Sequence, residues 1–151
     1  MGSAERRLRM DAAVFVVHEL AHARAALAAA AASGRRVVLL TPPDAAVYLG
    51  LRWMPALAVA ARAENPAAIA RTAVDCGDRL ALALEALRHG AEIVLFSGPV
   101  EEADRLLPAA SAAGAELWRS RPPALDLRAV PPEKAMVACR EWIERHGAVL
   151  K

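Results

Sequence analysis

The sequence predicts an α/β domain built on an open parallel sheet, because one pattern repeats four times along its 151 residues. In each repeat, a short run of branched apolar residues leads through a polar or glycine-containing turn to apolar residues at helical spacing. Strands and helices in alternation require right-handed crossovers, which make the strands parallel. A complete eight-unit barrel takes about 250 residues. We therefore expect one domain, residues 1–151, with three layers and four to five strands, either Rossmann-like or half-barrel-like.

The first repeat follows residues 1–10, a polar N-terminal segment that we expect to be flexible. Branched and aromatic residues favour a strand over Ala12–Val17. The alanine-rich stretch from about Glu19 to Ser33 favours a helix. Gly34 is expected to end this helix, because glycine readily adopts the positive φ of the residue that follows a helix. Val37–Leu40 is then the second strand.

The middle of the chain is less regular. The second helix is expected over Ala45–Ala63, where Pro55 should kink or divide it, because proline removes a backbone donor and clashes with the preceding turn. The third repeat has a short strand at Arg71–Val74 and a helix at Arg79–Arg88. We expect Asp78 to be the N-cap of that helix, since aspartate accepts hydrogen bonds from free backbone N–H groups.

The fourth repeat has the clearest pattern. Glu92–Phe96 has the continuous apolar run of a buried parallel strand, and Pro99 suits the first position of the following helix. Ala115–Trp118 could be a short fifth strand. A proline-rich connector, residues 119–132, should then lead to a final amphipathic helix, residues 133–146.

Composition narrows the functional classes. Hydrophobic residues make up 56% of the chain and the net charge is +2, which is too small for a nucleic-acid-binding surface; the preference for arginine is a bacterial-type composition. Cys76 and Cys139 lie far apart, which fits a reducing cytoplasm rather than a disulfide scaffold. The longest apolar stretch, Val47 to Ala61, is shorter than the roughly 20 residues of a membrane helix. We expect a soluble cytoplasmic protein without nucleic-acid or membrane partners.

The most specific chemical string is His18-Glu19-Leu20-Ala21-His22, an H-E-x-x-H sequence. It resembles the zincin metallopeptidases over these five residues. That resemblance implies a zinc hydrolase in which His18 and His22 bind the metal and Glu19 is the general base. The geometry requires a helix that begins before Val14. The β-branched and aromatic residues that precede His18 favour a strand instead, so we expect no metal or other cofactor here and keep zinc as the alternative.

The turns after parallel strands meet at the carboxyl edge of the sheet, where open α/β folds bind ligands. Polar or catalytically competent residues occur in each of these turns. An acid/base histidine, carboxylates and a potential thiol nucleophile would then share one rim. The candidate residues are His18, Thr41, Asp44, Asp75, Cys76, Asp78, Ser97 and Gly98.

The segment Val47–Leu57 is apolar around almost its whole helical projection, so it is either deeply buried or covered by another chain. Tyr48, Trp53 and Met54 are residue types common at interfaces, and we expect a homodimer through this segment. The sequence thus predicts a domain that binds a small molecule or partner at its rim. Two alternatives remain, the zinc hydrolase and a structural domain that acts through dimerisation, and no reaction follows from these residues alone.

Overall fold

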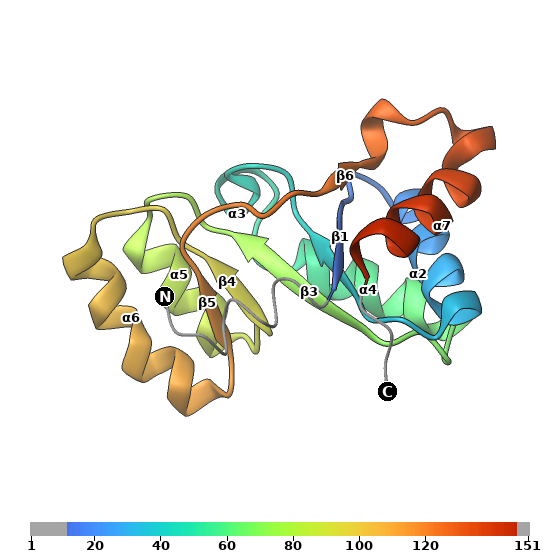
Figure 1. Cartoon of the computed structure of the whole chain (residues 1–151). Coiled ribbons are helices and arrows are strands. Elements are labelled where there is room, and N and C mark those ends of the chain that lie inside the picture. The colour runs from blue at the N-terminus through green and yellow to red at the C-terminus, as the bar shows by residue number, and fades with distance from the viewer. Residues whose placement is uncertain (1–11, 148–151) are drawn as a thin grey trace. The chain divides into compact units, whose positions relative to one another are not determined.

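The structure, a computed structural model, describes residues 12–147, so the N-terminal segment that was expected to be flexible lies outside the described residues. Helices and strands alternate along the chain (Figure 1). The strands are β1 (Ala13–Val16), β2 (Val37–Leu40), β3 (Ala70–Asp75), β4 (Ile93–Leu95), β5 (Glu116–Trp118) and β6 (Leu125–Asp126). The α-helices are α2 (Leu20–Ser33), α3 (Ala45–Tyr48), α4 (Trp53–Glu64), α5 (Leu80–Arg88), α6 (Val100–Ala113) and α7 (Ala135–His146). Two short 3-10 turns, η1 (Leu127–Ala129) and η2 (Pro132–Lys134), precede α7.

The strands form a parallel sheet with the order β5-β4-β3-β2-β1-β6, which confirms the predicted α/β class. Strands β1 to β5 are neighbours in chain order, as consecutive strands are in (β/α) barrels. The sixth strand lies on the other side of β1, so the strand order reverses between β1 and β6. The fifth strand is present, and β6 is an additional strand inside the segment expected to be a connector.

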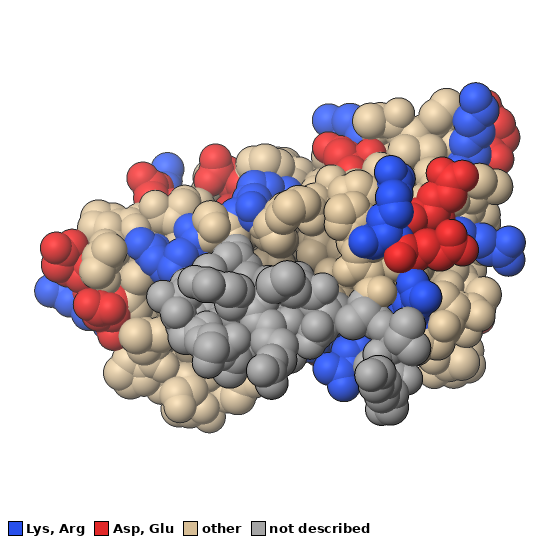
Figure 2. Space-filling view, in the orientation of Figure 1, with Lys and Arg blue, Asp and Glu red and all other residues tan. Residues whose placement is uncertain are grey.

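The chain divides into two compact units. Unit 1 comprises the described residues up to Leu39, Leu57–Arg71 and the described residues from Pro122 onward. Within it, α2 and α7 pack side by side (Figure 1). Both helices bury apolar residues: α7 buries Cys139 and Ile143, and α2 buries Ala23, Ala26, Ala29 and Ala30. Acidic and basic side chains are interspersed over the exposed surface of α7 (Figure 2).

Unit 2 comprises Leu40–Ala56 and Thr72–Arg121. Helices α5 and α6 pack against each other, and β4 and β5 pair in parallel. Phe96 and Trp118, which are 0% and 1% exposed, are the largest side chains of its core. Burial of such rings supplies several kcal/mol each, on the order of 3 kcal/mol for phenylalanine.

Several local predictions are confirmed. Helix α2 begins at Leu20 with Glu19 as its N-cap, as expected from the strand propensity before His18. Gly34 follows α2 in the left-handed conformation, with φ 67°. The C-terminal helix is also present, with its first turn wound as η2.

Other local predictions are wrong. Pro55 does not divide the second helix. The break comes before it, between α3 and α4, and Pro55 occupies the first turn of α4, where its missing N–H is not needed. Asp78 is not the N-cap of α5, because that position is taken by Arg79. Pro99 is the N-cap of α6 rather than its first residue. Among the described residues, no helix is long and apolar enough to span a membrane.

Candidate functional site

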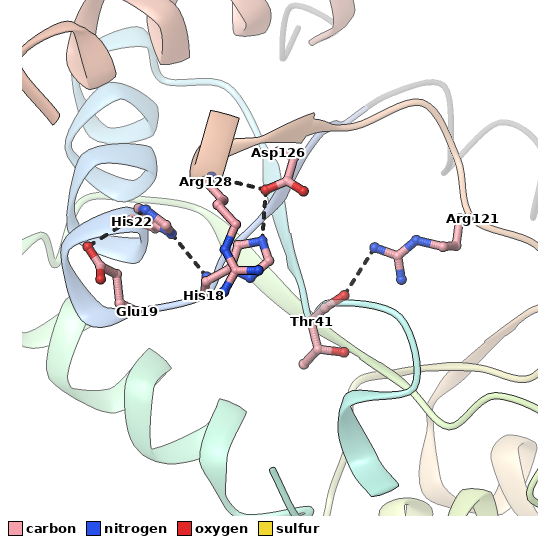
Figure 3. A network of polar contacts seen from close by, with 7 residues as sticks. All are labelled: His18, Glu19, His22, Thr41, Arg121, Asp126 and Arg128. Atoms are coloured by element: carbon pink, nitrogen blue, oxygen red, sulfur yellow. Dashed lines mark hydrogen bonds and ion pairs between the residues drawn. The ribbon is translucent and has the colours of Figure 1, made fainter. Parts of the chain in front are cut away.

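The clearest cluster of polar side chains in unit 1 lies where β1 and β6 end. His18 follows β1, and Asp126 is the last residue of β6, which pairs with β1. His18 Nε2 and Asp126 Oδ1 are 2.7 Å apart, with 13% and 49% of the two side chains exposed (Figure 3). Asp126 Oδ1 also accepts the backbone N–H of Arg128 at 3.0 Å, which caps η1. Ligands of open α/β folds bind where the strand order reverses, and β1 and β6 flank that point.

His22 is held in this cluster by the loop before α2. Its Nδ1 accepts a hydrogen bond from the backbone N–H of His18 at 3.0 Å, and the two rings meet edge to face (Figure 3). Neutral His22 therefore carries its proton on Nε2, 3.7 Å from Glu19 Oε1. Burial lowers the pKa of His22, and the nearby Glu19 carboxylate offsets part of that change. His22 is thus a neutral hydrogen-bond acceptor at neutral pH.

The H-E-x-x-H string does not form the helical pair that the zincin alternative requires. Residues 13–16 are a strand and the helix begins at Leu20, so His18 lies outside the helix. The Nδ1 lone pair of His22 is already occupied. Within residues 12–147, no group of three or more His, Cys, Asp or Glu side chains is arranged to hold a metal ion.

The titration of His22 makes the fold sensitive to acid. Because the folded state lowers the pKa of His22, the unfolded chain takes up its proton first as the pH falls below 6.5. The stabilisation from neutral His22 is complete above that pH and is lost as the pH falls. The His22→Gln variant should therefore lose less free energy of unfolding than the wild type on acidification, as measured by urea unfolding at several pH values. Equal losses in the two proteins would contradict this prediction.

Unit 1 contains a cavity of about 170 Å³ beside His22, and the start of α7 forms part of its wall. Its walls are formed by the loop before α2, by α2 itself, by the segment around η2 and by the start of α7. The lining residues are Glu19, Ala21, His22, Ala25, Val130, Pro132, Glu133, Ala135 and Met136. The cavity is mainly apolar, with two carboxylates and one imidazole as its polar groups.

The strand ends in unit 2 are held by internal hydrogen bonds. Asp75 is 3% exposed, and its Oδ2 lies 2.6 Å from Arg121 Nη1. Its Oδ1 accepts the N–H of Gly77, and its own N–H donates to the Thr41 hydroxyl. Arg121 also donates to the Thr41 carbonyl (Figure 3). Thr41 and Asp75 therefore lie together, and the Asp75 carboxylate is already bound by Arg121 and Gly77.

Ser97 and Gly98 belong to a second arginine-held turn. Arg119 donates to the carbonyls of Phe96 and Gly98, both at 2.7 Å, and its guanidinium lies over the Phe96 ring. Ser97 donates its backbone N–H to Gly77. Gly98 is required because a Cβ at this position would meet the Phe96 ring. These contacts indicate that the turn stabilises the fold of unit 2.

The other residues predicted at the rim are Cys76, Asp44 and Asp78. Burial raises the pKa of the Cys76 thiol to about 12, and Asp75 acts in the same direction, so Cys76 is protonated at neutral pH and is not an activated nucleophile. Asp44 has a left-handed backbone with φ 55°, and its carboxylate lies against Gly77. Asp78 is exposed and forms a surface ion pair with Arg79 at 3.8 Å.

Four residues that organise these strand ends were missed in the sequence: Arg119, Arg121, Asp126 and Arg128. All four follow the fifth strand, within the expected connector. The sequence did contain a signal for them. Charged residues stand between the prolines of this segment, at Arg119 to Arg121 and at Leu125 to Arg128.

Comparison with solved structures supports the fold. The chain matches a crystal structure of a Coccidioides immitis protein that carries a provisional assignment as a fructose-1,6-biphosphate aldolase, with a TM-score of 0.59 and 16% sequence identity. The match covers 76% of this chain and 47% of that chain, so the present chain corresponds to less than half of the aldolase structure. No family model and no curated protein matches the sequence. At this identity the likeness indicates the fold alone.

Proposed function

We propose that the protein binds a small molecule at the carboxyl ends of β1 and β6, in the cavity beside His22. The cavity itself is the observation that carries the proposal. Its wall includes Glu19 of the loop that follows β1, and the strand order reverses between β1 and β6, which is the usual ligand position in open parallel sheets. An apolar cavity of about 150 Å³ can hold benzene. A cavity of about 170 Å³ therefore suits a ligand with one ring or a short branched chain.

His18 and Asp126 support this site by positioning His22. The N–H of His18 fixes the His22 ring through Nδ1, and Asp126 holds the His18 side chain in place. Neither His18 nor Asp126 lines the cavity. The predicted acid/base histidine is thus proposed as a positioning residue for the binding site, and the proposal needs no metal or other cofactor.

Benzyl alcohol is a suitable neutral probe for the cavity. Titration of the protein with it should shift amide NMR signals of α2 and α7 next to the cavity. In an Ala25→Leu variant the added side chain fills the space, and these shifts should disappear. Ala32→Leu, an exposed substitution on the same helix, should bind as the wild type does. Shifts that persist in Ala25→Leu, or that fall elsewhere in the chain, would refute the proposed site.

A second candidate function is homodimerisation through Val47–Leu57. Met54 is 1% exposed and belongs to the core, but Val47, Tyr48 and Leu49 are 49%, 61% and 38% exposed. Three consecutive exposed apolar side chains are typical of a surface that another chain covers. These three residues, rather than Trp53 and Met54, are the proposed contact.

Light scattering coupled to size-exclusion chromatography should show twice the monomer mass, reduced to the monomer mass by Tyr48→Glu. Val100→Glu is the matched control, because Val100 is a single exposed valine, 62% exposed, on α6. A monomeric wild type at high concentration would exclude the dimer.

A further inference from the structure

We propose that the ligand of the His22 cavity is a primary amine carried on a small apolar body. The inference rests on the proposed function, because it names the ligand class of the same site. It follows from the charges of the lining residues, from the hydrogen-bonding state of His22 and from the composition of the walls.

The charged groups that line the cavity are both acidic. Glu19 stands in the loop before α2 and Glu133 in η2, so the two carboxylates come from segments far apart in the sequence. None of the nine lining residues is a lysine or an arginine. Arg128, whose positive charge acts on His22, is not a lining residue. An anionic ligand would therefore face two like charges here, whereas a cation is attracted.

His22 adds no positive charge to offset these carboxylates. Its Nδ1 accepts the N–H of His18, so the ring is held in the neutral state with its proton on Nε2. That proton lies on the side of Glu19, at an Nε2 to Oε1 distance of 3.7 Å. The His22 Nε2–H is the one side-chain donor among the lining residues, and the side-chain acceptors are the carboxylate oxygens of Glu19 and Glu133. A protonated primary amine supplies three N–H donors for such acceptors.

The walls select an organic cation over a metal ion. Six of the nine lining residues are apolar: Ala21, Ala25, Val130, Pro132, Ala135 and Met136. Calcium takes six to eight oxygen ligands and magnesium requires octahedral oxygen coordination. The side chains of the six apolar residues contain no oxygen atom that could bind either ion. An aromatic or branched alkyl group, in contrast, gains from burial against these walls. The amine group can then pair with the carboxylate of Glu19 or of Glu133.

Benzylamine, benzyl alcohol and benzoate test the ligand class, because they have closely similar size and differ in charge. NMR titration of the intact chain should show benzylamine binding about fivefold more tightly than benzyl alcohol, within the range of a partly exposed ion pair, and benzoate more weakly than either. Added sodium chloride should reduce the affinity for benzylamine and leave that for benzyl alcohol unchanged, because salt screens exposed charges.

Two variants locate the charge preference. Glu19→Gln and Glu133→Gln should each reduce the preference for benzylamine while benzyl alcohol still binds, and Glu144→Gln, an exposed glutamate of α7 that does not line this cavity, should keep the wild-type preference. If benzyl alcohol or benzoate binds as tightly as benzylamine, the amine inference is wrong and the binding site stands. If none of the three probes binds, the proposed function itself fails, and the inference fails with it.

Discussion

The Arg121→Ala variant should lose about 3 kcal/mol of its free energy of unfolding, the cost of leaving a buried carboxylate without its cation. Asp75 is 3% exposed, and Arg121 Nη1 lies 2.6 Å from its Oδ2. Without the guanidinium, that oxygen keeps neither its ion pair nor contact with bulk water. The carbonyl of Thr41 loses a donor in the same variant. Both losses destabilise the strand ends of unit 2.

Arg88→Ala is the matched control for this prediction. Arg88 Nη1 also lies 2.6 Å from a carboxylate oxygen, that of Glu85, but the two side chains are 70% and 44% exposed. An exposed pair contributes about 0–1 kcal/mol. Urea unfolding followed by circular dichroism should separate the two variants clearly. If both lose the same small amount, burial of Asp75 does not govern the strength of the pair.

The repeating pattern predicted the parallel sheet because each strand and helix carries its own local signal. Gly34 marked the end of α2 through a property of glycine itself. The sixth strand has no such signal. Leu125–Asp126 is too short to show an alternating pattern and lies close to prolines on both sides, so its pairing with β1 depends on tertiary contacts.

At the candidate site, too, the sequence predicted only what has a local signal. The strand propensity of the residues before His18 correctly indicated that His18 would lie outside the helix. His18 was identified from its position after a strand. Its partner Asp126 lies 108 positions away, and no spacing rule connects two such residues. The cavity could not be predicted from the sequence either, because its two carboxylates, Glu19 and Glu133, both come to line it through the packing of α2 against α7.

The second large effect is expected for Phe96→Ala, which should cost about 3–5 kcal/mol of unfolding free energy. The ring is fully buried at the end of β4. It packs against Gly98 on one side, where there is no room for a Cβ, and Arg119 lies over it at 5.5 Å from the ring centre. Truncation would remove the buried ring and leave a cavity beneath the guanidinium. Urea unfolding of the variant measures the loss directly.

Phe96→Leu separates the contribution of buried volume from that of the contact between the ring and Arg119. Leucine keeps much of the buried volume but has no aromatic face for the guanidinium. This variant should lose about 1 kcal/mol. A double-mutant cycle of Phe96→Leu with Arg119→Met should give a coupling energy of about 0.5–1 kcal/mol, the cation–π contribution. A coupling energy of zero would mean that Arg119 acts through the carbonyls of Phe96 and Gly98 alone. In that case the ring holds the turn by filling space, and Phe96→Ala should still show its full loss, since the cavity forms whether or not the guanidinium interacts with the ring.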